Sequence, residues 1–105
     1  MSDNNEQVQT SNPSDGSHYK TYNVQTKEQA EQLIEKAHEA FLQWRDSTFE
    51  RRAEIIQQIG QELTKDKEEL SKMMALQMGK PVSQGRKEVD LCAAIFQYTA
   101  EHGPD

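Results

Sequence analysis

The chain has 105 residues, of which 33% are hydrophobic and 29% charged, and 12 basic against 18 acidic side chains give a net charge of -6. This length allows one small domain and excludes a complete two-domain enzyme. The acidic balance argues against a nucleic-acid-binding protein, which carries a basic patch or stripe. The sequence has no apolar run near the ~18 residues of a membrane span, and its polar start MSDNNEQ is unlike a signal peptide. We therefore expect a cytoplasmic protein that binds neither nucleic acid nor membrane.

The first 25 residues are poor in hydrophobic side chains: they hold five, whereas residues 26–105 hold thirty. Asn12-Pro13-Ser14-Asp15-Gly16 is a cluster of turn formers, in which proline fixes φ and glycine can take positive φ. The flanking residues alternate only weakly between polar and apolar. Residues 1–25 therefore predict either a loose hairpin or a flexible tail, and both remain open.

Helical periodicity begins at Thr26. Thr26-Lys27-Glu28-Gln29 fits a capping box, and a helix to about Arg45 follows from apolar residues spaced three and four apart: Ala30, Leu33, Ile34, Ala37, Phe41 and Trp44. Ser47-Thr48-Phe49-Glu50 fits a second capping box. The helix that it opens is expected to end near Leu63, with one face formed by Phe49, Ala53, Ile56, Gly60 and Leu63.

Two further helices complete the chain. Asp66-Lys67-Glu68-Glu69 opens a short third helix, whose inner side is expected to hold Leu70, Met73, Met74 and Gln77. Gly79 suits the left-handed end of that helix, and Pro81 suits the first position of a fourth helix that runs to about His102. Its apolar stripe is Val82, Val89, Cys92, Ala93 and Phe96. The predicted fold is mainly α: about four amphipathic helices in residues 26–105, after a short extended or hairpin-like segment in residues 1–25.

The motifs that could carry chemistry fail on spacing. Gly79-Lys80 resembles the end of a phosphate-binding loop, but the glycine required five residues earlier is Met74 and the required Ser or Thr is Pro81. His38-Glu39 begins like a zinc-protease helix motif, but the second histidine position holds Leu42. His18 and His102 lie far apart along the chain. We therefore predict no catalytic, cofactor-binding or metal-binding residue.

The remaining reactive or adaptable side chains have structural interpretations. Cys92, the single cysteine, is expected to be buried because it lies on an apolar stripe. It is also expected to be unreactive, because no nearby cation or base would activate its thiol. Three methionines lie close together in the sequence: Met73, Met74 and Met78. We expect them to fill the core, and the alternative is that they form a partner-binding surface. Arg51-Arg52 and Arg86-Lys87 are flanked by glutamates, which favours exposed ion pairs over anion recognition.

Five short segments, in this order along the chain, carry a resemblance to a protein family. They are Asn12-Pro13-Ser14-Asp15-Gly16, Ala37-His38-Glu39-Ala40-Phe41-Leu42-Gln43-Trp44-Arg45, Phe49-Glu50-Arg51-Arg52-Ala53-Glu54-Ile55-Ile56, Met78-Gly79-Lys80-Pro81 and Glu88-Val89. Together they resemble the amino-terminal region of the aldehyde dehydrogenase superfamily over about residues 10–105. The succinate-semialdehyde dehydrogenase branch looks closest.

This resemblance implies oxidation of an aldehyde to an acid with NAD or NADP, through a cysteine nucleophile and a glutamate-activated water. In similar proteins these groups and the dinucleotide-binding strands follow the matched region, so the resemblance assigns no catalytic residue here, and Cys92 corresponds to a helix position. Many relatives hold a structural cation through a segment that corresponds to Thr10-Ser11 and a carboxylate whose position holds Gln77. Because that charge is missing, no metal is expected.

Two functions follow. The first is the amino-terminal segment of an NAD(P)-dependent aldehyde dehydrogenase, inactive alone, whose partner is the rest of such a chain or subunit, or a second copy through exposed apolar helix faces. The alternative is a stand-alone acidic helical module that docks on a protein partner. An orphaned segment should expose the apolar surface that it lays on its partner, whereas a module should be monodisperse and fold cooperatively.

Overall fold

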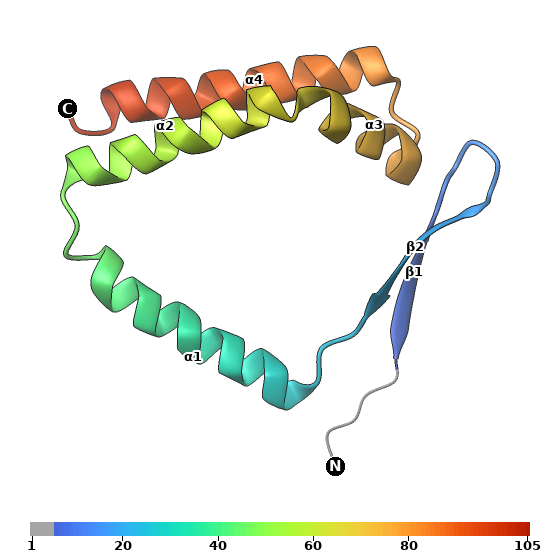
Figure 1. Cartoon of the computed structure of the whole chain (residues 1–105), viewed down its shortest axis with the longest axis horizontal. Helices are drawn as coiled ribbons and strands as arrows, with labels where there is room; N and C mark the ends of the chain where they lie inside the picture. Colours follow the sequence, from blue (N-terminus) through green and yellow to red (C-terminus); the bar gives the residue numbers. More distant parts are fainter. Residues whose placement is uncertain (1–5) are drawn as a thin grey trace.

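A computed structural model describes residues 6–105 as a hairpin followed by four helices (Figure 1). The strands β1 (Gln7–Ser11) and β2 (His18–Asn23) form a two-stranded antiparallel sheet. The helices are α1 (Lys27–Trp44), α2 (Phe49–Lys65), α3 (Lys67–Met78) and α4 (Val82–His102). This order confirms the predicted mainly-α fold. The part of the predicted tail that covers residues 1–5 lies outside the described residues.

The turn formers close the hairpin. Asn12 and Gly16 are joined by a hydrogen bond from the Gly16 amide to the Asn12 carbonyl at 2.8 Å, and Gly16 takes a φ of 74°. The Asp15 carboxylate accepts from the hydroxyl and amide of Ser17 at 2.7 and 2.9 Å, which lowers the pKa of Asp15. Of the two open interpretations, the hairpin is therefore the one that the structure has.

Of the two predicted capping boxes, the structure has one. The hydroxyl of Thr26 accepts from the amide of Gln29, whose side chain in turn accepts from the Thr26 amide, as predicted. The second box is wrong, because Thr48 caps α2 by accepting from the Arg51 amide at 3.0 Å. Ser47 instead donates its hydroxyl to the Trp44 carbonyl and so belongs to the end of α1.

Three other helix ends differ slightly from the predictions. Helix α2 runs one half-turn further than Leu63, to Lys65. Pro81 lies just before α4, not at its first position, and Asp66 makes no side-chain capping bond to α3. Gly79 ends α3 with a φ of 75°, so the left-handed cap is confirmed.

The packed part of the molecule is α4 against α2 and α3. Helices α2 and α4 approach closely at Gly60, where an added Cβ would lie 3.0 Å from the Cβ of Phe96. Helices α3 and α4 approach at Gly85, where it would lie 3.2 Å from the Cα of Ser71. Ser71 and Val89 are buried there, with 0% and 2% exposure. The spacing of apolar residues predicts the burial of Val89 but not that of Ser71, whose hydroxyl donates to the Lys67 carbonyl at 2.7 Å.

Ion pairs line the α3–α4 contact. Lys67 pairs with Asp90 at 3.2 Å, and Arg86 pairs with Glu68 at 2.9 Å. The hydrogen bond and charge of Glu68 raise the pKa of the Arg86 guanidinium. Because these side chains are 32% to 69% exposed, we expect little stability from each pair.

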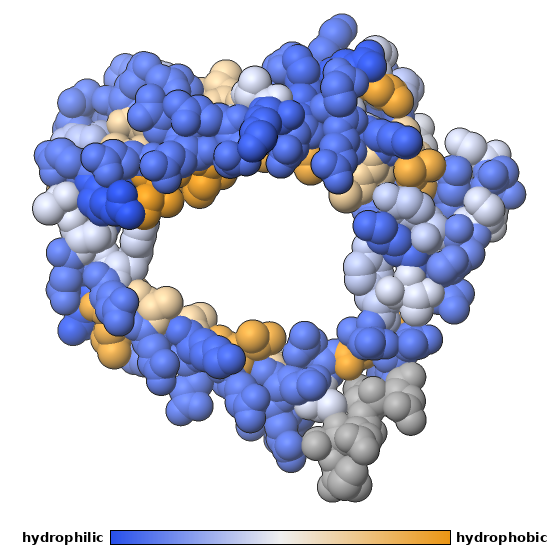
Figure 2. Space-filling view, viewed as in Figure 1, coloured by the Kyte–Doolittle hydropathy of each residue, from blue (hydrophilic) through white to orange (hydrophobic). Residues whose placement is uncertain are grey.

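Residues 6–105 together form a flat, open ring (Figures 1 and 2). Its extents are 47 × 45 × 16 Å and its radius of gyration is 18.2 Å. A compact domain of this length would have a radius of about 13 Å. Helix α1 forms one side of the ring, and no other element in residues 6–105 packs extensively against it. The hairpin completes the ring where its turn meets the end of α3, with Pro13 beside Gly79.

Candidate functional site

An apolar stripe runs along α1 without a covering element. The stripe, here called the α1 face, consists of residues spaced three and four apart: Ala30, Leu33, Ile34, Ala37, Phe41 and Trp44. All of them are exposed, and Ile34 retains 70% of its accessible surface. Figure 2 shows hydrophobic atoms along the side of α1 that borders the opening. The apolar stripe that predicts a packed helix face is thus open in the part of the chain that the structure describes, residues 6–105.

Helix α4 carries a second exposed apolar stripe, the outer α4 face, formed by Leu91, Ile95 and Tyr98. These residues are 55% to 63% exposed and lie on the side of the helix turned away from Val89. The outer α4 face is not among the predicted stripes, because the prediction for this helix used only the stripe that includes Val89. The spacing of four and three between the three residues is the signal that could have found it.

Exposed hydrophobic residues outnumber buried ones. In residues 6–105, Val89 is the one buried hydrophobic side chain, whereas thirteen large ones are exposed. An exposed apolar helix stripe such as the α1 face is typical of interaction sites. The α1 face and the outer α4 face are therefore the candidate functional sites, and the chemistry that they can perform is the binding of other apolar protein surface.

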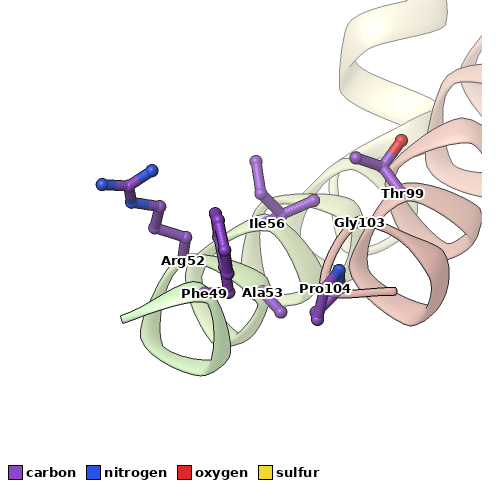
Figure 3. Close-up of a pocket in the computed structure, with 7 residues that line it drawn as sticks. All are labelled: Phe49, Arg52, Ala53, Ile56, Thr99, Gly103 and Pro104. Atoms are coloured by element: carbon purple, nitrogen blue, oxygen red, sulfur yellow. The ribbon is translucent and has the colours of Figure 1, made fainter. Parts of the chain in front are cut away.

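A shallow pocket of about 120 Å³ lies between the start of α2 and the end of α4 (Figure 3). Its lining is Phe49, Arg52, Ala53, Ile56, Thr99, Gly103 and Pro104. The only charged side chain in this lining is Arg52, which is engaged by the connection between α1 and α2. The lining residues include no acid, base or thiol, so this pocket suits an apolar side chain and not a reaction.

The Gly79 amide and the Lys80 ammonium both bind groups within the chain. The Gly79 amide donates to the Ala75 carbonyl at 3.0 Å, and the Lys80 ammonium pairs with Glu88. Both groups that a phosphate would need therefore have partners within the chain. The interpretation of Gly79 as a helix cap is confirmed.

The histidines lie on separate elements. His38 is exposed on α1 beside Phe41, whereas His18 bonds the Thr21 hydroxyl and His102 contacts the Tyr98 carbonyl. In the part of the chain that the structure describes, no group of three or more histidine, cysteine or acidic side chains could hold a metal ion. That the chain binds no metal stays a prediction.

Thr10 and Gln77, at the positions where the resemblance would place a cation, also have partners within the chain. The Thr10 hydroxyl contacts the backbone of Lys20, and the Gln77 amide donates to the Tyr22 hydroxyl at 3.5 Å. Gln77 is exposed, so its predicted place on the inner side of α3 is wrong.

The expected burial of Cys92 is wrong, because its side chain is exposed. The stripe of α4 that packs against α2 and α3 includes four buried or half-buried residues: Gly85, Val89, Ala93 and Phe96. Cys92 lies at the border of that stripe. Core filling by methionine holds only in part, since Met73 and Met74 are half-buried whereas Met78 is exposed. Met78 is the last residue of α3, where no element in residues 6–105 covers it.

The arginines divide into ordinary ion pairs and one exception. Arg51 pairs with Glu54 at 3.1 Å, as predicted, and Arg86 pairs across helices with Glu68 instead of with its neighbour Glu88. Arg52 was expected to form an exposed ion pair, which is wrong. Its guanidinium binds backbone carbonyls at the end of α1. The sequence gives no signal for this, because the acceptors are main-chain atoms.

None of the helices in residues 6–105 combines the length and the apolar character that a membrane span requires.

A sequence model described as "Aldehyde dehydrogenase family" matches residues 1–105. The succinate semialdehyde dehydrogenase [NAD(P)+] Sad of Escherichia coli is 38% identical over 74 residues, which are 70% of this chain and 16% of that enzyme. The succinate-semialdehyde dehydrogenase [NADP(+)] of Deinococcus radiodurans is 32% identical over 95 residues, 90% of this chain and 20% of that enzyme.

Solved structures give the same relationship. A succinic semialdehyde dehydrogenase from Streptococcus pyogenes, in complex with NADP+, superposes with a TM-score of 0.83 at 30% identity, over 89% of this chain and 21% of that one. A betaine aldehyde dehydrogenase from Staphylococcus aureus, in complex with NAD+, gives 0.88 at 25% identity, over 95% of this chain and 21% of that one. The chain thus spans about a fifth of the length of the relatives that it matches.

Proposed function

The chain belongs to the aldehyde dehydrogenase family, and we propose that it acts as the amino-terminal segment of an NAD(P)-dependent enzyme of this family. In this proposal the remaining four-fifths of such an enzyme, in the same chain or as a separate subunit, covers the α1 face and the outer α4 face. The observation that carries the proposal is the open α1 face, which no element in residues 6–105 covers extensively. Burial of apolar surface is the main force that would hold the two parts together.

We propose succinate semialdehyde as the aldehyde of the whole enzyme. Relatives from Escherichia coli, Deinococcus radiodurans and Streptococcus pyogenes that carry this name support the proposal. Because their names include both NAD(P)+ and NADP+, we propose that the whole enzyme uses NAD or NADP. We also propose that it works in the cytoplasm, since the exposed, unpaired thiol of Cys92 suits a reducing compartment.

The chain by itself is proposed to be inactive. Hydride transfer needs the aldehyde carbon and the nicotinamide held almost in contact, and such positioning can be worth about 7 to 11 kcal/mol of the barrier. In this chain the Gly79 amide and the Lys80 ammonium already bind protein groups. Cys92 lies in the middle of α4, away from any helix N-terminus that could activate a thiol. The residues present therefore do not fit a dinucleotide or a catalytic thiol.

The test is an assay of the isolated chain with succinate semialdehyde and either NAD or NADP, with a complete relative as the positive control. We expect no formation of NADH or NADPH above buffer. A titration with each nucleotide, followed by Trp44 fluorescence and thermal unfolding, should show no saturable change. Binding at a hundred times the dissociation constant would add about 2.7 kcal/mol of stability. Turnover or saturable stabilisation would contradict the proposal.

The alternative of a stand-alone acidic module predicts different solution behaviour. Such a module would be monomeric, would unfold in one cooperative transition and would not bind a hydrophobic dye. An orphaned segment would bind the dye through the α1 face or associate with itself. Size-exclusion chromatography with light scattering, combined with dye fluorescence, separates the two.

A further inference from the structure

Arg52 joins the two helices on either side of the first bend. Its side chain starts in the first turn of α2 and reaches back over the connection to the end of α1. The terminal Nη2 donates to the carbonyl of Arg45 at 2.9 Å and to that of Trp44 at 3.3 Å. The Nε group donates to the hydroxyl of Ser47 at 3.1 Å. The three acceptors thus come from the end of α1 and the connection, and the donor comes from α2.

Two aromatic rings flank the same guanidinium. Its central carbon lies 5.8 Å from the ring centroid of Trp44, in the last turn of α1, and 5.7 Å from that of Phe49, the first residue of α2. These distances are within the range of cation–π attraction. Figure 3 shows the Arg52 side chain extending beside the ring of Phe49. One side chain of α2 therefore contacts both helices at their junction.

The chemistry suits arginine in particular. The last carbonyls of a helix lack partners within the helix and carry partial negative charge, so a cationic donor is favoured there. The planar guanidinium directs its donors along fixed lines and stacks on rings, which a lysine ammonium cannot do. Helix α1 does not pack extensively against any other described element. The direction of α1 is therefore set by this junction at one end of the helix and by the connection to the hairpin at the other end.

We propose that Arg52 is a positioning residue that fixes the direction of α1 relative to the α2–α4 pair and so holds the ring open before a partner covers the α1 face. This role does not depend on which partner fills the ring. It would lower the cost of docking, because α1 would already point in its final direction.

The test measures the distance between α1 and α4 in the full 105-residue chain. Spin labels are attached to Cys92, the exposed single cysteine, and to the exposed polar position of Lys36 through Lys36→Cys. Pulsed electron paramagnetic resonance then gives the distribution of distances between the two labels. We expect one narrow peak with Arg52 and loss of that peak in Arg52→Ala and Arg52→Lys, with helix content by circular dichroism unchanged.

The matched control is Arg51→Ala, which removes the same charge from the neighbouring residue and breaks only the pair with Glu54. This variant should keep the narrow peak. A narrow, unshifted peak in Arg52→Ala or Arg52→Lys would overturn the proposal. Loss of helix content in both Arg52 variants would also overturn it, since Arg52 would then support the helices in general and not the direction of α1.

Discussion

Small residues decide how closely the helices of this chain approach. Gly60, Ser71 and Gly85 are buried at the two crossings with α4, where larger side chains would push the backbones apart. Gly79 has another reason to be glycine, since it holds a φ of 75° at the end of α3 and faces Pro13 of the hairpin. At this scale the sequence predicted what depends on local geometry, such as the Gly79 cap. It did not predict the burial of Ser71 against Gly85 of α4, or the bonds from Arg52 to carbonyls at the end of α1, because only the fold brings these groups close.

Replacing Gly79 with valine should destabilise the chain by more than about 1 kcal/mol, because a β-branched residue resists positive φ. An added Cβ would also lie 3.1 Å from the Cγ of Pro13. The free energy of unfolding, measured with urea, checks this. Ser83→Val, which puts the same side chain at an exposed position in the first turn of α4, should cost much less. Equal costs in the two variants would contradict the special role of Gly79.

The thiol of Cys92 should react with a disulfide reagent at nearly the same rate in the folded chain and in denaturant, because its side chain is exposed. Spectroscopic detection of the released thiolate gives both rates, and Cys92→Ala should give no signal. A folded chain that reacts far more slowly would mean that another copy or segment covers this part of α4.

At the scale of elements, periodicity predicted helices that the structure has, with boundaries within about two residues, which is the usual scatter. What it could not predict is which apolar stripe is covered. The stripes of α1 and α4 have the same spacing, yet the stripe of α4 that includes Val89 is packed, whereas the α1 face is open. Spacing reports that a face is apolar, and only the fold reports what lies against it.

The contact between α2 and α4 should be sensitive to volume at Gly60. Gly60→Leu should lower the free energy of unfolding by about 1 to 3 kcal/mol, the usual cost of overpacking, because an added Cβ would already lie 3.0 Å from the Cβ of Phe96. Gln58→Leu, at an exposed position of the same helix, is the matched control and should have little effect. A tolerated Gly60→Leu would mean that the two helices do not pack as the structure has them.

The α1 face should accept charge in the isolated chain. Ile34→Lys combined with Phe41→Lys should reduce hydrophobic dye binding and change the free energy of unfolding by no more than about 0.5 kcal/mol per substitution, as expected for exposed positions. Gln32→Lys, on the opposite side of α1, should leave dye binding unchanged. Strong destabilisation by the paired substitutions would show that the α1 face is packed in the free chain.

At the scale of the molecule, the fold is open, with a radius of gyration of 18.2 Å and one buried hydrophobic side chain in residues 6–105. Length and composition predicted a small helical protein but not a ring, because the arrangement of helices depends on a few junctions such as Arg52. The openness agrees with a segment that covers about a fifth of its relatives. Its apolar faces are therefore expected to be completed by protein that lies outside the 105 residues.

The most direct test of this account is the native state of the protein in its own cells. Antibodies against residues 6–105 would recover the native product, and intact mass spectrometry with peptide sequencing would identify what is joined or bound to it. We predict an aldehyde dehydrogenase catalytic region, either in the same chain, at a mass several times the 12.1 kDa of the 105 residues, or in a stoichiometric complex. A free 12.1 kDa product that is monomeric and folds cooperatively would contradict the account.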